Sequence, residues 1–415
     1  MPTIRLGTFA LILLLLFGPA GAKASDPPSS GHPVFDRVVD LVTDHFYDES
    51  ALERFNTAVQ SEIKNSPVTA DSSDAEVGKA IDAILASLQA SHTGRFKPNT
   101  IDYFELIDIF RFAVRDDMRR LFPPDGEASY PGIGMVTRQI NDVRFVTDVY
   151  DGSAADRAGI LVGDEIIAVD GEPYHEIDSF KDKIGRTVEV RLRRSQGAQP
   201  MAVKVAVERL RPLRSFAKAI ENSVTVTEHE GKEIGYFRFW TLSSSDGMEI
   251  VARELATGRL KDVDGLVVDL RGRWGGGRSD AAELFLGNTP AFRLVPRKGD
   301  DVLANVRWHG PIVAIIDEGT RSGLEVFAHA LKSNGIPLVG SRTAGALLAG
   351  RAYLLPDDSL LELAVFDAVL GEDERLEGRG VPPDVPVAFD LPYAAGKDPQ
   401  LDTAMAEMRR ILANL

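Results

Sequence analysis

The sequence has 415 residues, more than one ordinary hydrophobic core accommodates, so about two or three domains are expected. Its 44% hydrophobic and 26% charged residues are typical of a globular protein. The net charge of −15 argues against partners such as nucleic acid or an anionic membrane surface. Because the chain has no cysteine, a thiol nucleophile, a disulfide and a cysteine-bound metal are all excluded.

The first 24 residues have the pattern of a secretory signal peptide. Arg5 precedes the apolar run FALILLLLF, and small residues follow as far as Ala24. The apolar run is short for a bilayer span, and no later segment is apolar enough to cross a membrane. We therefore expect cleavage after Ala22 or Ala24, export to the periplasm or the medium, and a mature chain without a membrane span.

Residues 25–33 are predicted to be a linker, and residues 34–122 a helical region. Apolar side chains recur at helical spacing in FDRVVDLVTDHFYD, and VGKAIDAILASLQA repeats this pattern. FELIDIFRFAVRDDMRRLF is predicted to be a third helix. The proline and glycine residues of LFPPDGEASYPG then mark the end of the helical region.

Residues 128–212 contain short β-type runs, with short helices predicted at SAADRAG and EIDSFKDKI. This pattern alone permits a plain small β-barrel. The stretch Gly132, Ile133, Gly134 and Met135, followed by SAADRAGILVGDEIIAVDGEP, resembles a PDZ domain. The resemblance implies that a peptide with a free, apolar C-terminus binds beside these four residues, whose backbone N–H groups hold its carboxylate.

Residues 214–415 alternate between apolar β-type runs and helical segments. The predicted strands are IGYFRFWTL, GLVVDLR, PIVAIID and IPLVG, and the predicted helices are MEIVARELATG, SDAAELFLG and GLEVFAHALKS. This alternation predicts an α/β domain with a largely parallel sheet and crossover helices.

Two loops of this domain carry chemistry only in combination. The glycines of DLRGRWGGGRS could direct backbone N–H groups at a negative charge, but the loop lacks the known phosphate-binding spacings and alone is compatible with an ordinary turn. Ser322 lies between a predicted strand and a predicted helix. It could be an N-cap that contributes about 1 kcal/mol to stability, or a nucleophile at the positive end of the helix dipole.

In their serial order, DLRGRWGGG, IIDEGTRSGLEVFAHALKSNGIPLVGSRTAG and LEGRGVPPDVPV resemble the C-terminal processing peptidases, which include the tail-specific proteases and the tricorn-core relatives. The resemblance covers nearly all of the mature chain. It implies a multi-domain α/β protein in which a helical region and a PDZ domain precede a crotonase-like peptidase core. It also implies that Ser322 is the nucleophile and that backbone N–H groups of Gly275 or Gly276 and of Gly323 form the oxyanion hole.

The general base is where the sequence departs from the processing-peptidase branch, in which a lysine follows the Thr-x-Gly turn. Here that position is Ala346, and no lysine lies between Lys332 and Lys397. A Ser–Lys mechanism is therefore not expected.

The tricorn-like branch instead uses a histidine from a Ser-His pair and a glutamate near the end of the chain. LQASHTGRF contains Ser91 and His92, and LEGRGVPPD contains Glu377. The resemblance implies that His92 is the general base and that Glu377 orients it. Without the resemblance, His92 would be interpreted as a helix-terminal histidine and Glu377 as a surface carboxylate.

Two further departures are Arg273, where the family has asparagine, and Arg321, where it has a small residue beside the serine. Three functions remain open: an exported serine endopeptidase that forms an acyl-enzyme, an inactive PDZ-bearing binding protein, and a hydrolase of non-peptide esters or amides. For the first of these, we expect protein or peptide substrates and neither a cofactor nor a metal. The sequence leaves the oligomeric state open.

Overall fold

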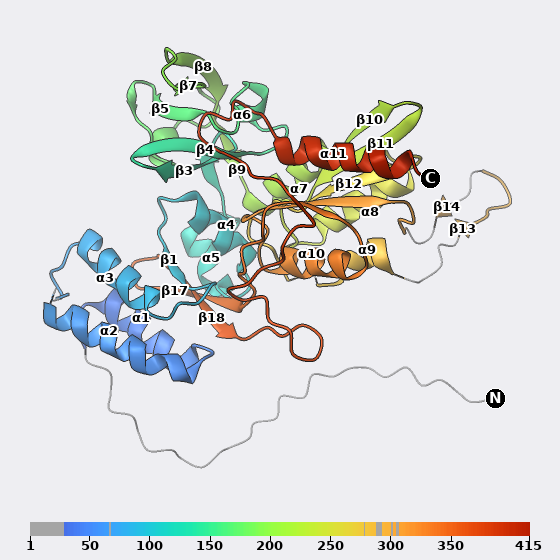
Figure 1. Cartoon of the computed structure of the whole chain (residues 1–415). Helices are drawn as coiled ribbons and strands as arrows, with labels where there is room; N and C mark the ends of the chain where they lie inside the picture. Colours follow the sequence, from blue (N-terminus) through green and yellow to red (C-terminus); the bar gives the residue numbers. More distant parts are fainter. Residues whose placement is uncertain (1–28, 66–67, 278, 288–292, 300–301, 304–306) are drawn as a thin grey trace.

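The computed structural model describes residues 29–415 except 66–67, 278, 288–292, 300–301 and 304–306 (Figure 1). The predicted signal peptide and the first part of the predicted linker lie outside the described residues. In the described ranges, no helix combines the length and the apolar character needed to cross a membrane.

The N-terminal part is helical, as predicted, but its described residues form five α-helices where the sequence pattern indicated three. Its elements are α1 (Pro33–His45), η1 (Glu49–Ala51), α2 (Leu52–Asn65), α3 (Asp74–Ala86), β1 (Gly94–Phe96), α4 (Ile101–Ile109) and α5 (Arg115–Leu121). The prediction of one helix over FELIDIFRFAVRDDMRRLF is wrong, because Phe110 leaves helical geometry and α5 starts only at Arg115. Phe112, in the intervening turn, is 76% exposed, so the apolar face does not continue.

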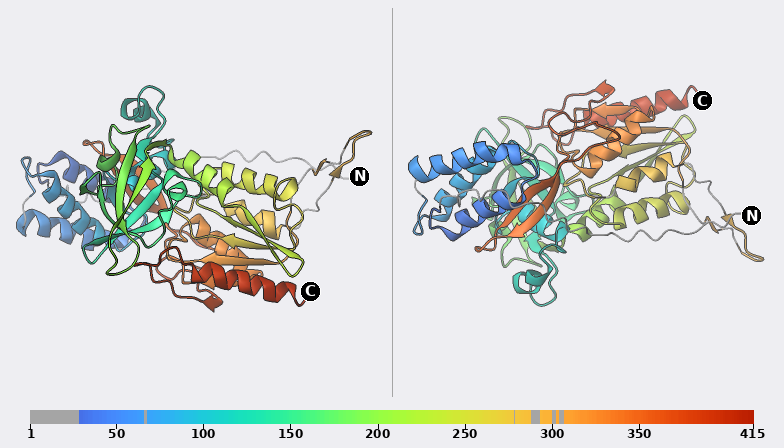
Figure 2. Two further views of the ribbon diagram at one scale, coloured as in Figure 1. Left: turned by 90° about the horizontal axis from the view of Figure 1, so that it is seen from above. Right: turned by 90° about the horizontal axis from the view of Figure 1, so that it is seen from below.

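A hairpin from the last third of the chain completes the N-terminal part. It consists of β17 (Ala349–Leu354) and β18 (Leu360–Phe366), and β18 pairs antiparallel with both β17 and β1. Leu361 and Leu363 pack against α1 to α3, whereas Leu360 packs with α4 and α5 on the other side. Figure 2 shows the orange hairpin among the blue helices. Residues far apart in sequence therefore share one small body.

The PDZ region forms its own sheet, in the order β3-β4-β5-β7-β8, with β6 paired to β5. The elements are β2 (Tyr130–Gly132), β3 (Met135–Ile140), β4 (Val143–Val149), α6 (Ala154–Arg157), β5 (Glu165–Val169), β6 (Glu172–Pro173), η2 (Asp178–Phe180), β7 (Thr187–Arg193), β8 (Met201–Ala206) and β9 (Glu208–Leu210). The helix predicted over EIDSFKDKI is only the turn η2. Ile177 and Phe180 enter two different apolar clusters, whereas residues three apart on a regular helix would share a face.

The C-terminal part has the predicted, largely parallel sheet, in the order β10-β11-β12-β15-β16-β19, in which only β10 is antiparallel to its neighbour. Its strands are β10 (Thr225–His229), β11 (Lys232–Arg238), β12 (Gly265–Asp269), β15 (Ile312–Ile316), β16 (Leu338–Gly340) and β19 (Val385–Pro386). The other elements are α7 (Pro212–Ser223), α8 (Asp246–Ala256), η3 (Ser279–Ala282), α9 (Glu283–Leu286), β13 (Arg293–Leu294), β14 (Val302–Leu303), α10 (Gly323–Ser333) and α11 (Pro399–Leu412).

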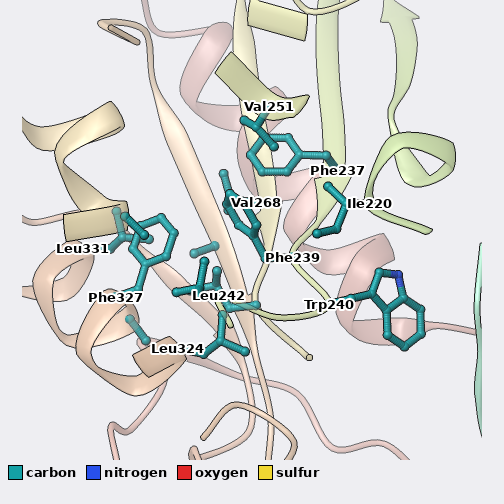
Figure 3. Packing of buried hydrophobic residues seen from close by; sticks show 14 of the residues in the cluster. Ile220, Phe237, Phe239, Trp240, Leu242, Val251, Val268, Leu324, Phe327 and Leu331 are labelled. Atoms are coloured by element: carbon teal, nitrogen blue, oxygen red, sulfur yellow. The ribbon is translucent and has the colours of Figure 1, made fainter. Parts of the chain in front are cut away.

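Helices cover both faces of this sheet. One face packs against α7, α8 and α10 through a large cluster that includes Phe237, Val268 and Phe327 (Figure 3). The opposite face packs against α11, whose Met408 contacts β12 and β15 side chains such as Val267. The buried, adjacent strands β12 and β15 are thereby fixed, and their carboxyl ends lie side by side.

Candidate active site

The glycine loop and the serine turn follow these two adjacent strand ends. The loop begins after Asp269 at the end of β12, and the turn to Ser322 begins after Ile316 at the end of β15. A Cβ on Gly275 would lie 2.2 Å from the Arg321 carbonyl oxygen and 2.6 Å from Ser322 Cβ. Only glycine fits at this position, so the contact between the two loops depends on the glycine-rich sequence.

Ser322 has a strained backbone at the start of α10. Its φ of 54° and ψ of −127° are unusual for a residue with a side chain, and such strain costs about 1–3 kcal/mol. Its backbone N–H donates to the Ala346 carbonyl at 2.9 Å and to Glu325 Oε2 at 3.3 Å. Nucleophilic serines of α/β-hydrolases also occupy a strained strand-to-helix turn. The strain is therefore a feature that a simple N-cap does not require.

The buried carboxylate of Glu325 fixes this turn against the loop that contains Ala346. It accepts the Thr343 hydroxyl at 2.6 Å and the backbone N–H groups of Gly345 and Ala346 at 2.8 and 2.7 Å. Burial raises the pKa of Glu325, and these hydrogen bonds act in the opposite direction. The sequence interpretation missed this residue. Its place in SGLE, three residues after Ser322, has the capping-box spacing that could have indicated it.

The three predicted oxyanion glycines lie together beside Ser322. A Cβ on Gly323 would lie 1.9 Å from the Gly276 carbonyl oxygen, and a Cβ on Gly275 would lie 2.9 Å from the Gly323 nitrogen. In the part of the chain that the structure describes, the N–H groups of Gly275, Gly276 and Gly323 donate no hydrogen bond. Unpaired backbone donors next to a serine are the groups that an oxyanion hole needs.

His92 belongs to a hydrogen-bonded chain with the other two residues predicted to assist it. Its Nδ1 lies 2.9 Å from the Ser91 hydroxyl, which donates to Glu377 Oε2 at 2.8 Å. Glu377 also accepts the backbone N–H groups of Ser91 at 2.9 Å, Leu347 at 2.8 Å and Leu348 at 3.3 Å. The sequence interpretation had the glutamate orienting the histidine; in the structure, the contact runs through Ser91.

These contacts define the histidine tautomer. Because the Ser91 hydroxyl gives its one proton to the Glu377 carboxylate, His92 Nδ1 must donate its proton to Ser91. In the neutral ring, His92 Nε2 is then an unprotonated acceptor. Burial, and then the nearby Arg321, lower the pKa of His92 to about 3, which keeps the ring neutral near pH 7.

One cavity of about 290 Å³ brings the two halves of the site together. It is lined by His92, Leu106, Ile109, Phe110, Ser243, Trp274, Gly276, Gly277, Arg321, Ser322, Leu348, Ala349, Gly350 and Glu362. Ser322 and His92 thus share a cavity, although within the described residues no hydrogen bond joins them. Ser91 and Glu377 support His92 from outside the lining.

The two arginines that depart from the family pattern have different surroundings. Arg273 points to α4, where it binds Glu105 at 2.6 Å and Asp102 at 2.6 Å, and the Trp274 indole N–H also donates to Glu105 at 2.5 Å. Arg273 thus connects the glycine loop to the N-terminal body. Arg321 instead lies in the site, with its guanidinium 5.2 Å from the centre of the Trp274 ring.

The predicted PDZ loop is tightly packed against the segment before α6. Gly134 has a φ of 82°, and a Cβ there would lie 2.4 Å from Ser153 Cβ, so glycine is required. Ile133 and Met135 are buried, and Gly132 ends β2. The strand β3, which follows the loop, is an edge strand of the PDZ sheet.

A larger cavity of about 830 Å³ lies between β3 and the serine turn. Val136 and Arg138 of β3 line this larger cavity. Trp274 and Arg321 line it too, and both also line the smaller cavity around Ser322, which we call the serine cavity. Because the two cavities share these lining residues, the edge strand β3 and Ser322 lie along adjoining cavities. Within the described ranges, no group of three or more histidine or acidic side chains is arranged to hold a metal ion.

Comparisons with known proteins agree with the sequence resemblance. Residues 233–387 match the model of peptidase family S41, and residues 145–194 match a PDZ domain. The chain is 24% identical over 286 residues to the carboxy-terminal processing protease CtpB of Bacillus subtilis. The aligned region covers 65% of this chain and 58% of that protein. It is 31% identical over 270 residues to tricorn protease homolog 1 of Streptomyces coelicolor. This aligned region covers 61% of this chain and 24% of that protein.

The fold is also similar to solved structures. The photosystem II D1 C-terminal processing protease matches with a TM-score of 0.51 and 21% identity, over 90% of this chain and 99% of that one. The tricorn protease matches with a TM-score of 0.52 and 21% identity, over 91% of this chain and 36% of that one. Against the curated relatives CtpB and chloroplastic processing peptidase 3 of Arabidopsis thaliana, the match spans about half of the relative's length (58% and 50%). The chain thus contains a segment that matches peptidase family S41 and a segment that matches a PDZ domain, and it is similar to carboxy-terminal processing proteases.

Proposed function

We propose that this chain is an exported serine endopeptidase that cleaves protein or peptide substrates through an acyl-enzyme at Ser322. The observation that carries this proposal is the chain of hydrogen bonds Glu377–Ser91–His92 beside a cavity that Ser322 shares with His92. Export rests on the sequence pattern of residues 1–24.

The geometry supports a triad mechanism with an added serine. His92 Nε2 takes the proton of Ser322 as the hydroxyl oxygen attacks the scissile carbonyl, while Nδ1–H keeps its bond to Ser91. The developing imidazolium is stabilised through Ser91 by the Glu377 carboxylate. His92 then protonates the leaving amine, and in the second half-reaction it activates the water that hydrolyses the acyl-enzyme.

The unpaired N–H groups of Gly275 or Gly276 and of Gly323 would hold the tetrahedral oxyanion. Each such donor lowers the barrier by about 3 kcal/mol. The helix α10, whose N-terminus begins at Gly323, adds the positive end of its dipole. Substrate would reach the serine along the larger cavity from β3, where the PDZ edge could accept a peptide as an added strand.

A labelling experiment separates this function from its two alternatives. An activated Ser322 reacts with a fluorophosphonate, and Ser322→Ala loses both labelling and hydrolysis of a peptide library while keeping the circular dichroism spectrum of the parent. A binding protein without activity would show no labelling. A panel of non-peptide esters and amides, hydrolysed in preference to every peptide, would instead indicate the other class of hydrolase.

Capture of a free C-terminus is tested separately. One peptide with an apolar last residue is titrated as the free acid and as the amide, with Ser322→Ala to prevent cleavage. We expect the free acid to bind more tightly, because the amide removes the charge that the backbone N–H groups beside Gly134 would hold. Equal affinity of the two forms would rule out recognition of the carboxylate.

A further inference from the structure

Glu362 is a buried carboxylate in the serine cavity to which the proposed mechanism gives no role. It lies on the central strand β18, opposite Gly94 of β1 and Ala352 of β17. Its relative exposure is 3%, and it lines the same cavity as Ser322 and His92. The sequence interpretation did not single it out, although an acidic residue in the apolar run LLELAVF was a visible signal.

Glu362 has no partner in the described part of the chain. No hydrogen bond and no ion pair within 4 Å involves its carboxylate, whereas Glu325, also buried, accepts four hydrogen bonds. The Glu362 oxygens are not among the fully buried side-chain atoms without a partner, so we take the carboxylate to face the cavity, where ionisation without a counter-charge is unfavourable. Such a group indicates a function or an absent ligand rather than a contribution to stability.

The cavity around Glu362 fits a long side chain with a cationic end. The apolar lining is formed by Leu106, Ile109, Phe110, Leu348 and Ala349. Gly350 leaves space beside the carboxylate: a Cβ there would lie 3.1 Å from Glu362 Oε1 and 3.2 Å from His92 Cβ. Apolar walls suit the methylene groups of lysine or arginine, and a carboxylate suits the charged group.

We propose that Glu362 is a specificity-determining residue that selects lysine or arginine in the substrate residue on the acyl side of the scissile bond. This inference rests on the proposed peptidase function. The substrate cation would supply the missing partner of the carboxylate. Glu362 and His92 line the same cavity as Ser322, so a substrate side chain that pairs with Glu362 would lie next to the nucleophile.

Two charged neighbours modulate this pocket. Arg321 attracts the Glu362 carboxylate, and it lines both cavities, whereas Glu362 lines the serine cavity and not the larger one. The pKa of Glu362 is raised to about 7: burial raises it most, Arg321 opposes this, and Asp102 adds to it. A bound ammonium or guanidinium group would favour the ionised carboxylate further, which couples ionisation of Glu362 to recognition of a basic residue.

The test compares kcat/KM for peptides that differ only at this position: lysine, arginine, norleucine and leucine. In Glu362→Gln, we expect kcat/KM for the lysine and arginine peptides to fall at least about 30-fold, because the pairing of a desolvated charge is lost. The norleucine and leucine peptides should change little. The matched control is Glu372→Gln, which removes an exposed carboxylate that lines neither the serine cavity nor the larger cavity.

An equal loss for all four peptides would overturn the inference, as would an unchanged preference. A binding measurement makes the result independent of turnover: in Ser322→Ala, the lysine peptide should bind more tightly than the norleucine peptide, and adding Glu362→Gln should remove the difference. If the parent cleaves no peptide but this difference is present, the proposed function fails and the selectivity of the pocket stands. If cleavage occurs without the difference, Glu362 has no role in selection.

Discussion

Two sets of charged side chains around the serine cavity differ in how they are paired. Glu325 and Glu377 each accept four hydrogen bonds, and these bonds fix the serine turn and the His92 ring. Arg321 and Glu362 line the cavity without an ion pair in the described part of the chain. The paired carboxylates maintain the geometry of the site, whereas the unpaired groups are available to a charged ligand.

The removal of His92 should have the largest effect among the variants that test this comparison. His92→Ala leaves Ser91 and Glu377 in place but removes the imidazole that lines the serine cavity among the described residues. We expect kcat to fall by roughly 10⁴-fold or more, with the melting temperature little changed. Steady-state hydrolysis and thermal unfolding measure the two quantities. Near-parent activity in this variant would leave the proton acceptor unidentified.

Substitutions of Glu325 and of Glu362 should change the free energy of unfolding in opposite directions. Glu325→Ala leaves the Thr343 hydroxyl and the N–H groups of Gly345 and Ala346 without their acceptor, so we expect a loss of roughly 3 kcal/mol or more in the free energy of unfolding. Denaturant unfolding measures it. The exposed Glu318→Ala is the control.

Glu362→Gln should instead stabilise the protein, and only at higher pH. Because the pKa of Glu362 is raised to about 7, the folded carboxyl keeps a proton that the unfolded chain releases above about 4.5. The folded state is therefore disfavoured as pH rises through this window. The melting temperature of Glu362→Gln should exceed that of the parent at pH 8 and approach it at pH 5. An equal change at both pH values would contradict an unpaired, buried carboxylate.

Glu377→Gln should have a smaller effect on rate than the loss of His92. A glutamine keeps an acceptor for the Ser91 hydroxyl, so the ring orientation is partly preserved, but the negative charge that stabilises the imidazolium is lost. We expect kcat to fall roughly 10- to 100-fold with KM nearly unchanged. A loss as large as that of His92→Ala would mean that Glu377 does more than orient the base.

The smallest expected effect is a displacement of the pH profile. Burial and Arg321 lower the pKa of His92, so the imidazole stays unprotonated below its usual value of about 6.5. With a peptide that carries norleucine at the selected position, the acidic limb of kcat/KM should lie well below pH 6.5. Arg321→Met should move it upward, because a positive charge is removed. A limb at or above pH 6.5 in the parent would contradict this arrangement of charges.

The spacing of apolar residues predicted much of the fold, because this spacing shows which face of a single helix or strand is buried. The buried strand β12 and the amphipathic helix α10 were predicted from their own residues. The turn η2 was not, because Ile177 and Phe180 pack into different clusters, and only the tertiary structure determines which cluster surrounds a residue.

The sequence by itself determined the residue types and the serial order of the site: the glycine loop, Ser322, the absence of a lysine at Ala346, and the Ser91-His92 pair. The tertiary structure decided how they meet. The pairing of β1 with β18 brings the segment after His92 to the C-terminal part of the chain, and Glu377 reaches Ser91 across 286 positions of sequence. It also decided that Glu325 is paired and Glu362 is not, because the environment of a buried charge depends on contacts between distant segments.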